Sequence, residues 1–276
     1  MDLYTRVAYQ TSRHLTLAYS TSFGISSKLF SASIRPHIYA VYGLVRVADE
    51  IVDTYTGTDQ RELLDALELE TYTAIKTGYS TNLIVHAFAL TARQYGITKT
   101  IIAPFFTSMR MDLSPQTYTE KLYKTYIYGS AEVIGLMCLR VFCSGNDTQY
   151  ESLREGAQAL GAAYQKVNFL RDLASDSQSL NRMYFPGTTF ASFDEAAKKA
   201  IIDDIEKDIR LAKESLARLP KSSRVAVSTS LSYYSTLLEK LRHTSAERIK
   251  QKRVRVNNAH KLALLVKTIA KESTQS

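Results

Sequence analysis

The stretch His37–Tyr55, HIYAVYGLVRVADEIVDTY, combines a mostly apolar surface with a single polar stripe. Tyr42, Arg46, Asp49 and Asp53 are separated by three or four residues, which places them on one face of a helix. A helix that is apolar nearly all round is typically buried. Because this helix keeps a polar stripe, we expect the stripe to line an internal cavity.

The two aspartates of this stripe repel each other. Like charges one helical turn apart cost on the order of 0.2–0.5 kcal/mol on an exposed helix, and more in a cavity of low dielectric constant. Arg46 offsets part of that repulsion, and a divalent cation would offset more. Carboxylates suit Mg²⁺, which proteins usually hold together with substrate phosphates. Taken alone, the pair is weak evidence, because it is more often found on a solvated acidic helix with local Arg–Asp pairing.

A second stripe of the same design lies in LGAAYQKVNFLRDLASD, residues 160–176. Its members supply oxygen ligands at intervals of three or four residues: Gln165, Asn168, Asp172 and Asp176. Arg171 lies beside the stripe, and the opposite faces are apolar. Two such helices facing each other would gather four carboxylates, which need several divalent ions. Those ions in turn need an anionic ligand, for which diphosphate is the natural candidate.

Helix signals dominate the rest of the chain, which has only 11 Gly and 5 Pro. Apolar residues at helical spacing predict helices over 2–18, 36–54, 60–77, 82–95, 98–111, 118–143, 148–177, 194–218, 222–243 and 258–270. Segment 177–192 is predicted to be an ordered loop, either a flap or an ordinary connection. No alternating strand pattern, repeat or linker interrupts the chain, so we predict one all-α domain over residues 1–276.

Composition limits the class of protein. The chain has 276 residues, of which 45% are hydrophobic and 22% charged, a mix that excludes disordered and fibrous proteins. Its 2 cysteines cannot form a disulfide framework, which favours a reducing compartment. No apolar stretch reaches the roughly 18–20 residues that span a bilayer, and the start has no apolar leader core. We therefore expect a cytoplasmic protein.

The net charge of +8 is concentrated near the C-terminus, where residues 221–276 hold 12 of the 35 Lys and Arg but only 3 of the 27 Asp and Glu. Such a segment suits nucleic acid, a membrane surface or an anionic substrate. No recognised nucleic-acid module surrounds the basic stretch Arg248–Arg255, so we expect no nucleic-acid partner. Apart from those around Arg253, the Lys and Arg of this C-terminal segment are expected to hold the protein peripherally at an anionic membrane face.

The motifs, taken in order, resemble those of the squalene/phytoene synthases, which join two prenyl diphosphates head to head. The resemblance runs from about Tyr19 to Leu265. It is carried by Tyr19–Phe23, Asp49–Asp53, Tyr126–Gly135, Gln165–Asp176, Asn181–Pro186, and Arg253–Val256 with Lys261. Glu132 departs from the pattern, because many members have a small residue there.

The resemblance implies an isoprenoid-synthase helical bundle around a central cavity. It implies Mg²⁺, or Mn²⁺ in its place, bound by Asp49, Asp53, Asn168, Asp172 and Asp176. It implies prenyl diphosphate contacts from Ser20, Ser22, Phe23, Arg46, Gln165, Asn168, Arg182, Tyr184 and Arg253. It implies catalytic roles for Tyr42, Tyr128 and Arg171.

The expected activity is condensation of two geranylgeranyl diphosphates to phytoene through a cyclopropyl diphosphate, in carotenoid biosynthesis. Metal and arginine would neutralise the leaving diphosphate, and an apolar cavity would shield the allylic cation from water. Tyrosine faces would stabilise that cation by about 0.5–2 kcal/mol per contact. The proton acceptor is either Tyr128 or the released diphosphate.

Three alternatives stay open. The nearest is condensation of two farnesyl diphosphates (C15 rather than C20) to squalene or dehydrosqualene, with NADPH required only for squalene. A non-catalytic assembly relative is disfavoured because all the aspartate ligands are present. A chain elongator or terpene cyclase on the same fold is disfavoured by the pattern from Gln165 to Asp176.

Overall fold

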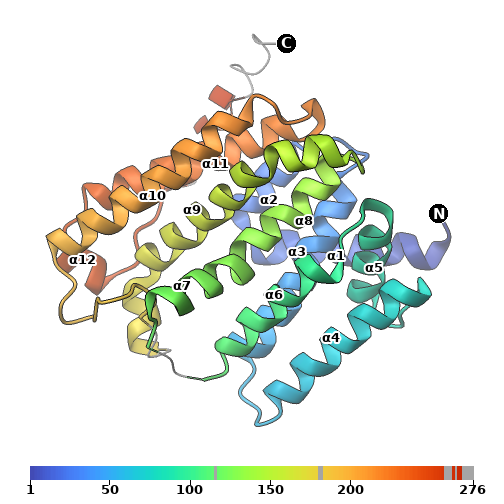
Figure 1. Ribbon diagram of the computed structural model, residues 1–276, viewed down its shortest axis with the longest axis horizontal. Helices are drawn as coiled ribbons and strands as arrows, with labels where there is room; N and C mark the ends of the chain where they lie inside the picture. The colour runs from blue at the N-terminus through green and yellow to red at the C-terminus, as the bar shows by residue number, and fades with distance from the viewer. Residues whose placement is uncertain (115–116, 180–182, 258–262, 265, 269–276) are drawn as a thin grey trace.

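The computed structural model describes residues 1–114, 117–179, 183–257, 263–264 and 266–268, with no account of the side chains of 21, 22 and 177–179. It is 77% helical, and the described part contains no strand. The all-α prediction is therefore confirmed. Figure 1 shows the helices packed in a bundle, with the long α9 running diagonally across it.

The helical elements follow one another along the chain. They are α1 (Leu3–Tyr19), α2 (Thr21–Ser27), α3 (Arg35–Asp49), the π-helical turn η1 (Glu50–Thr54), α4 (Gln60–Thr77), α5 (Leu83–Tyr95), α6 (Lys99–Met111), α7 (Glu120–Ile127), the π-helical turn η2 (Tyr128–Glu132), α8 (Val133–Phe142), α9 (Asp147–Ser179), α10 (Glu195–Leu216), α11 (Lys221–Arg242) and α12 (Ala246–Gln251).

Local sequence sets many of these boundaries. Ser20 caps α2, because its Oγ accepts a hydrogen bond of 3.2 Å from the Phe23 backbone N–H. Asp194 caps α10 in the same way, accepting from the Ala197 N–H at 2.8 Å. At the other end of a helix, Gly78 terminates α4 with a φ of 82°, a conformation that disfavours residues with a Cβ.

The helix predictions are largely confirmed, with three differences. The predicted helix 36–54 is α3 followed by η1, and the predicted helix 118–143 is α7, η2 and α8 in sequence. The short helices α2 and α12 are not predicted from the sequence. The predicted helix 258–270 falls mostly outside the described residues, of which 263–264 and 266–268 are helical.

Helix α9 lies at the centre of the packing. It contacts α10 and α11 on one side and α8 and η2 on the other (Figure 1). A Cβ added at Gly161 would lie 2.6 Å from the carbonyl oxygen of Ala131, so only glycine allows α9 to approach the η2 backbone this closely. Two large hydrophobic clusters fill the bundle, one around α3, α5, α6 and α8 and one around α9, α10 and α11, and a third, small cluster lies between α1, α3 and α5.

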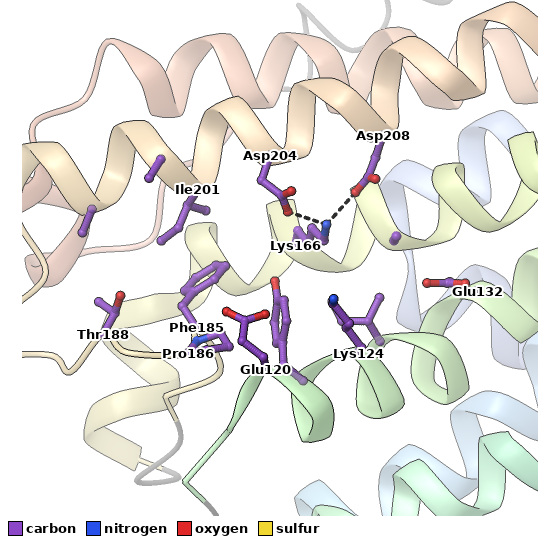
Figure 2. Close-up of a pocket in the computed structure, with 15 residues that line it drawn as sticks. Glu120, Lys124, Glu132, Lys166, Phe185, Pro186, Thr188, Ile201, Asp204 and Asp208 are labelled. Carbon is purple, nitrogen blue, oxygen red and sulfur yellow. Dashed lines mark hydrogen bonds and ion pairs between the residues drawn. The ribbon is translucent and has the colours of Figure 1, made fainter.

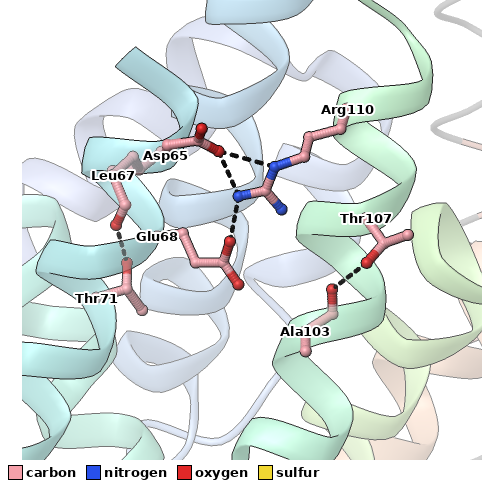
Figure 3. Close-up of polar contacts among 7 residues, drawn as sticks. All are labelled: Asp65, Leu67, Glu68, Thr71, Ala103, Thr107 and Arg110. Carbon is pink, nitrogen blue, oxygen red and sulfur yellow. Dashed lines mark hydrogen bonds and ion pairs between the residues drawn. The ribbon is translucent and has the colours of Figure 1, made fainter. Parts of the chain in front are cut away.

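An arginine clamp fixes α6 to α4 near the end of α6 (Figure 3). The Arg110 Nε donates to Asp65 Oδ1 at 2.8 Å, and its Nη2 forms an ion pair with Glu68. A guanidinium shared by two carboxylates is geometrically restrictive. The clamp therefore holds the chain in place just before Asp112, which belongs to the candidate site.

Candidate active site

The first acidic stripe spans α3 and η1. Asp49 ends the α-helical part and is partly buried, whereas Asp53 lies in the π turn and is exposed. The turn is closed by a hydrogen bond of 2.9 Å from the Tyr55 N–H to the Glu50 carbonyl oxygen, five residues back. Such wide turns are rare and frequently mark functional sites. The predicted helical stripe is thus locally widened at its second aspartate.

Negative charge accumulates around Asp49. Burial raises the pKa of this carboxyl to about 7, the charge of Asp53 adds to the rise, Arg46 opposes it, and Asp112 raises it further. Asp112 comes from the end of α6 and accepts a 2.8 Å hydrogen bond from the Tyr126 hydroxyl. A bound cation at this position would relieve the accumulated charge.

Arg46 is oriented by two neighbours. It forms an ion pair with Glu50 one turn later, and its guanidinium lies 4.3 Å from the ring centroid of Tyr19. Its Nε is buried and has no hydrogen-bond partner among the described residues. A buried N–H without a partner is unfavourable unless a ligand satisfies it. The pairing with Glu50 was not predicted from the sequence.

The predicted N-terminal substrate segment packs beside Tyr42. The Phe23 ring stacks on the Tyr42 ring with centroids 5.3 Å apart and an interplanar angle of 14°. A hydrogen bond with the side chain of Ser20 opposes the rise in the Tyr42 pKa that burial causes. The structure thus brings Ser20, Phe23 and Tyr42 together, while the Ser22 side chain lies outside the description.

The second acidic stripe lies on α9, where two arginines hold Asp172. The Arg171 Nε donates to Asp172 Oδ1 at 2.9 Å, and the Arg253 Nε pairs with the same oxygen at 2.7 Å. Arg253 belongs to the extended segment after α12, far from Asp172 in sequence. The predicted basic motif is therefore brought directly onto the predicted second metal-binding helix.

The amides of this stripe have nearby polar partners. The Gln165 Nε2 donates to Ser130 Oγ in η2 at 3.4 Å, and Asn168 Oδ1 accepts from the Tyr234 hydroxyl at 3.4 Å. Asp176, the last residue of the stripe, is partly buried. The amides therefore link α9 to η2 on one side and to α11 on the other.

Tyr234 on α11 was missed by the sequence analysis. Besides its bond to Asn168, it lies close enough to Tyr42 for its charged form to raise the pKa of Tyr42. Its ring stacks on Tyr164 with centroids 3.8 Å apart. Tyr234 thus connects the two stripes, and the only sequence signal was a pair of tyrosines within a predicted helix.

Two other predicted residues, Tyr128 and Tyr184, have distinct surroundings. Tyr128 begins η2 and is partly buried against the hydrophobic core. Tyr184 is buried and stacks on Phe169, with ring centroids 3.8 Å apart, so its ring forms part of an aromatic cluster. Arg182 lies outside the described residues. The aromatic cluster also contains Tyr126, the partner of Asp112.

The oxygen donors of both stripes have the chemistry that Mg²⁺ prefers. The accumulated negative charge at Asp49 also fits a cation, although in the described residues no three His, Cys, Asp or Glu side chains converge as a ready-made metal centre. Asp172 instead faces two guanidinium groups. The donor set fits a metal that is shared with an anionic ligand, rather than one enclosed by protein alone.

Within the described part of the chain, no helix combines the length and apolar character needed to cross a membrane.

Comparison with known proteins identifies relatives of this chain. Residues 16–260 match the family model described as squalene/phytoene synthase. The chain is 28% identical to the phytoene synthase of Arthrospira platensis over 260 residues, 85% of this chain and 84% of that protein. It is 25% identical to the 4,4'-diapophytoene synthase of Staphylococcus haemolyticus over 206 residues, 72% of this chain and 68% of that protein.

Solved structures share the fold. A dehydrosqualene synthase in complex with a ligand superposes with a TM-score of 0.83 at 19% identity, covering 98% of each chain. The squalene synthase HpnC of Alicyclobacillus acidocaldarius gives a TM-score of 0.77 at 20% identity, covering 92% of this chain and 98% of that one. At these identities the likeness establishes the architecture, and the expected isoprenoid-synthase fold is confirmed.

Proposed function

The chain belongs to the squalene/phytoene synthase family of prenyltransferases, and on that premise we propose that it condenses two geranylgeranyl diphosphates head to head to phytoene, in carotenoid biosynthesis. The observation that carries the proposal is the meeting of Arg171 and Arg253 at Asp172. Two guanidinium groups on one carboxylate of an acidic helix are well placed to receive a diphosphate.

Ionisation of the allylic diphosphate is the first demand of the chemistry. The C1–O bond breaks, and the diphosphate leaves with the electron pair. Arg46, Arg171 and Arg253 would bind its oxygens, and the free Nε of Arg46 is an available donor. Mg²⁺, or Mn²⁺, held by Asp49, Asp53, Asn168, Asp172 and Asp176, would supply further charge neutralisation for the leaving group.

The allylic cation then needs an aromatic and water-poor environment. Tyr42 would offer its ring face, because burial raises its pKa and keeps the phenol neutral. The C2–C3 double bond of the second chain attacks C1 of the cation, and proton loss, to Tyr128 or to the released diphosphate, closes a cyclopropyl diphosphate. Departure of the second diphosphate, rearrangement and loss of a proton give the linear hydrocarbon.

The second candidate is condensation of two farnesyl diphosphates to dehydrosqualene or squalene. The similarity to a 4,4'-diapophytoene synthase and to the dehydrosqualene synthase fold supports it. NADPH would be needed only for squalene, in which a hydride replaces the final proton loss. A purely non-catalytic assembly role is the remote candidate, because both acidic stripes are complete.

One incubation separates these candidates. The protein is supplied with C20 or C15 diphosphate and Mg²⁺, with and without NADPH, and the extracted hydrocarbon is identified by mass spectrometry. We expect phytoene from the C20 substrate without NADPH. A product from C15 alone would support the second candidate, and no hydrocarbon under any condition would overturn the enzymatic assignment.

The location proposed for the protein is cytoplasmic and peripheral at the inner membrane face. Exposed basic side chains beyond α10 support it, among them Lys240, Arg248, Lys252 and Arg255. Each such charge near an anionic surface contributes about 1 kcal/mol. Sedimentation with anionic vesicles but not with neutral ones is the expected result, and equal partitioning would remove the proposal.

A further inference from the structure

A pocket of about 370 Å³ opens between α7, α9, α10 and the segment 185–188 (Figure 2). Its α9 residues are Ala162 and Lys166, which lie on a different face of that helix from Asn168 and Asp172. None of its lining residues belongs to the two acidic stripes. The pocket is therefore separate from the diphosphate site, and an inference about it does not depend on the proposed reaction.

The charge of the pocket is negative. Lys166 is held between two carboxylates of α10, with its Nζ 2.5 Å from Asp204 Oδ2 and 2.8 Å from Asp208 Oδ2 (Figure 2). Only 12% of the lysine side chain is exposed, so its charge is fully engaged. Glu120 and Glu132 add two negative charges to the lining. Only Lys124 opposes them, so acidic groups remain in excess.

Tyr123 lines the same pocket with a polar group that lacks a partner. The residue is 8% exposed, and among the described residues nothing forms a hydrogen bond with its hydroxyl. Burial raises the Tyr123 pKa, and the nearby charges of Asp204 and Asp208 raise it further. The hydroxyl therefore lies near negative charge within the pocket.

Two carboxyls of the pocket experience the same excess of negative charge. Burial raises the pKa of Glu132, and the charge of Asp208 raises it further, although a 3.0 Å hydrogen bond from Gln158 opposes the shift. Burial likewise raises the pKa of Asp208, against the effect of Lys166. A positively charged occupant would stabilise all of these groups at once.

The shape of the pocket selects the kind of cation. In the described chain its carboxylates do not form a group that could hold a metal ion, so their charges are spread rather than convergent. The walls between them are apolar or aromatic, with the Tyr123 and Phe185 rings 6.2 Å apart and Ile127 and Ile201 nearby. Separated charges with apolar surface between them suit an extended organic cation, and the volume lies in the usual range of ligand sites.

We propose that this pocket binds a linear organic polyamine, with protonated amines at Glu120, Glu132 and the Asp204–Asp208 pair and with methylene groups against the apolar wall. The ammonium of Lys166 already shows how a primary amine is received between Asp204 and Asp208. The Tyr123 hydroxyl would accept a hydrogen bond from a neighbouring amine.

The test uses the full chain in metal-free buffer with spermidine as the probe, followed by isothermal titration calorimetry. We expect saturable binding that weakens with added salt. The Glu132→Gln variant keeps the amide contact with Gln158 but loses charge, and we expect about tenfold weaker binding. Glu120→Gln changes an exposed residue and provides the same test if the Glu132 variant does not fold. Glu214→Gln, an exposed residue of α10 outside the pocket, is the matched control and should bind like the unmodified chain.

Tyr123→Phe gives a second readout. Removal of the hydroxyl should reduce the affinity for spermidine, because the pocket loses a hydrogen-bond acceptor for an amine. The absence of spermidine binding would overturn the proposal, and so would equal affinity in the Glu132, Glu120 and Glu214 variants. Displacement of spermidine by equimolar Mg²⁺ would replace the organic ligand with a metal and would also overturn it.

Discussion

The two acidic stripes share one sequence design but differ in their electrostatic state. On α3 and η1, Asp49 is surrounded by further carboxylates, and its pKa rises to about 7. On α9, Asp172 is neutralised by Arg171 and Arg253. Aspartates at the same spacing therefore leave an excess of negative charge at Asp49, whereas Asp172 is already paired with two guanidinium groups. Under the proposed function, a cation would be attracted first to Asp49, and the two guanidinium groups paired with Asp172 would turn to the anionic ligand when it binds.

The largest expected effect tests whether both stripes are needed. Asp49→Asn, Asp53→Asn, Asp172→Asn and Asp176→Asn should each lower turnover about a thousandfold, because each removes charge that assists ionisation of the diphosphate. Steady-state rates of variants with unchanged circular dichroism provide the measurement. Asp203→Asn, which removes an exposed surface pair with Lys199, is the control. If only the Asp49 and Asp53 variants kept near-normal rates, the first stripe would not be needed for turnover, and only the aspartates of α9 would be.

The next prediction concerns stability and tests the charged state of the first stripe. Because the folded-state pKa of Asp49 is raised above its ordinary value of 3.8 to about 7, folding favours the protonated carboxyl. Stability that is present below pH 4 is therefore lost as the pH rises toward 7. Without metal, Asp49→Asn should therefore be more stable than the unmodified chain at pH 8. A rise of about three pKa units corresponds to about 4 kcal/mol, and because Asp49 is only partly buried we expect a gain of about 2–3 kcal/mol.

Urea unfolding at pH 4 and at pH 8 measures this difference. At pH 4 the two proteins should have nearly equal free energies of unfolding. Asp172→Asn is the matched comparison on α9, and it should show no such gain because it leaves two arginines without their shared carboxylate. A gain of equal size in both variants would mean that the stripes do not differ in charge.

A smaller effect tests how tightly each stripe-bearing helix is packed. A Cβ at Gly161 of α9 would lie 2.6 Å from a backbone oxygen, whereas one at Gly43 of α3 would lie 3.3 Å from side-chain atoms of Ile84 and Ser12. We expect Gly161→Ala to lower the free energy of unfolding by about 1–2 kcal/mol. Gly43→Ala should change it less, because side chains adjust more readily than backbone. Thermal denaturation of both variants decides the order.

The smallest expected effect tests whether Arg253, which is paired with Asp172 in the second stripe, also contacts the diphosphate. Arg253→Gln should reduce kcat/KM about tenfold through the loss of a charged diphosphate contact. Arg255→Gln, two residues away and exposed, is the control. Inhibition by inorganic diphosphate should weaken in parallel for Arg253→Gln only. Unchanged inhibition would assign Arg253 a purely structural role at Asp172.

Local sequence predicted most of the helices and both stripes, because apolar periodicity and ligand spacing are local properties. The π turns were missed, since η1 differs from an α-helix by one residue per turn and leaves the apolar pattern nearly intact. The link from Tyr234 to Asn168 was also missed, because it joins residues 66 apart on different helices. The role of Arg253 was anticipated only through family resemblance, because nothing local connects it to Asp172.

The continuous length of helix α9 links the residues on its different faces mechanically. Its 33 residues form one uninterrupted rod, about 50 Å long. Lys166 on one face and Gln165 on the adjoining face are neighbours in sequence, so neither can be displaced along the rod without the other. A displacement of α9 as a whole, imposed at its contacts with α10, would therefore also change the position of Asp172.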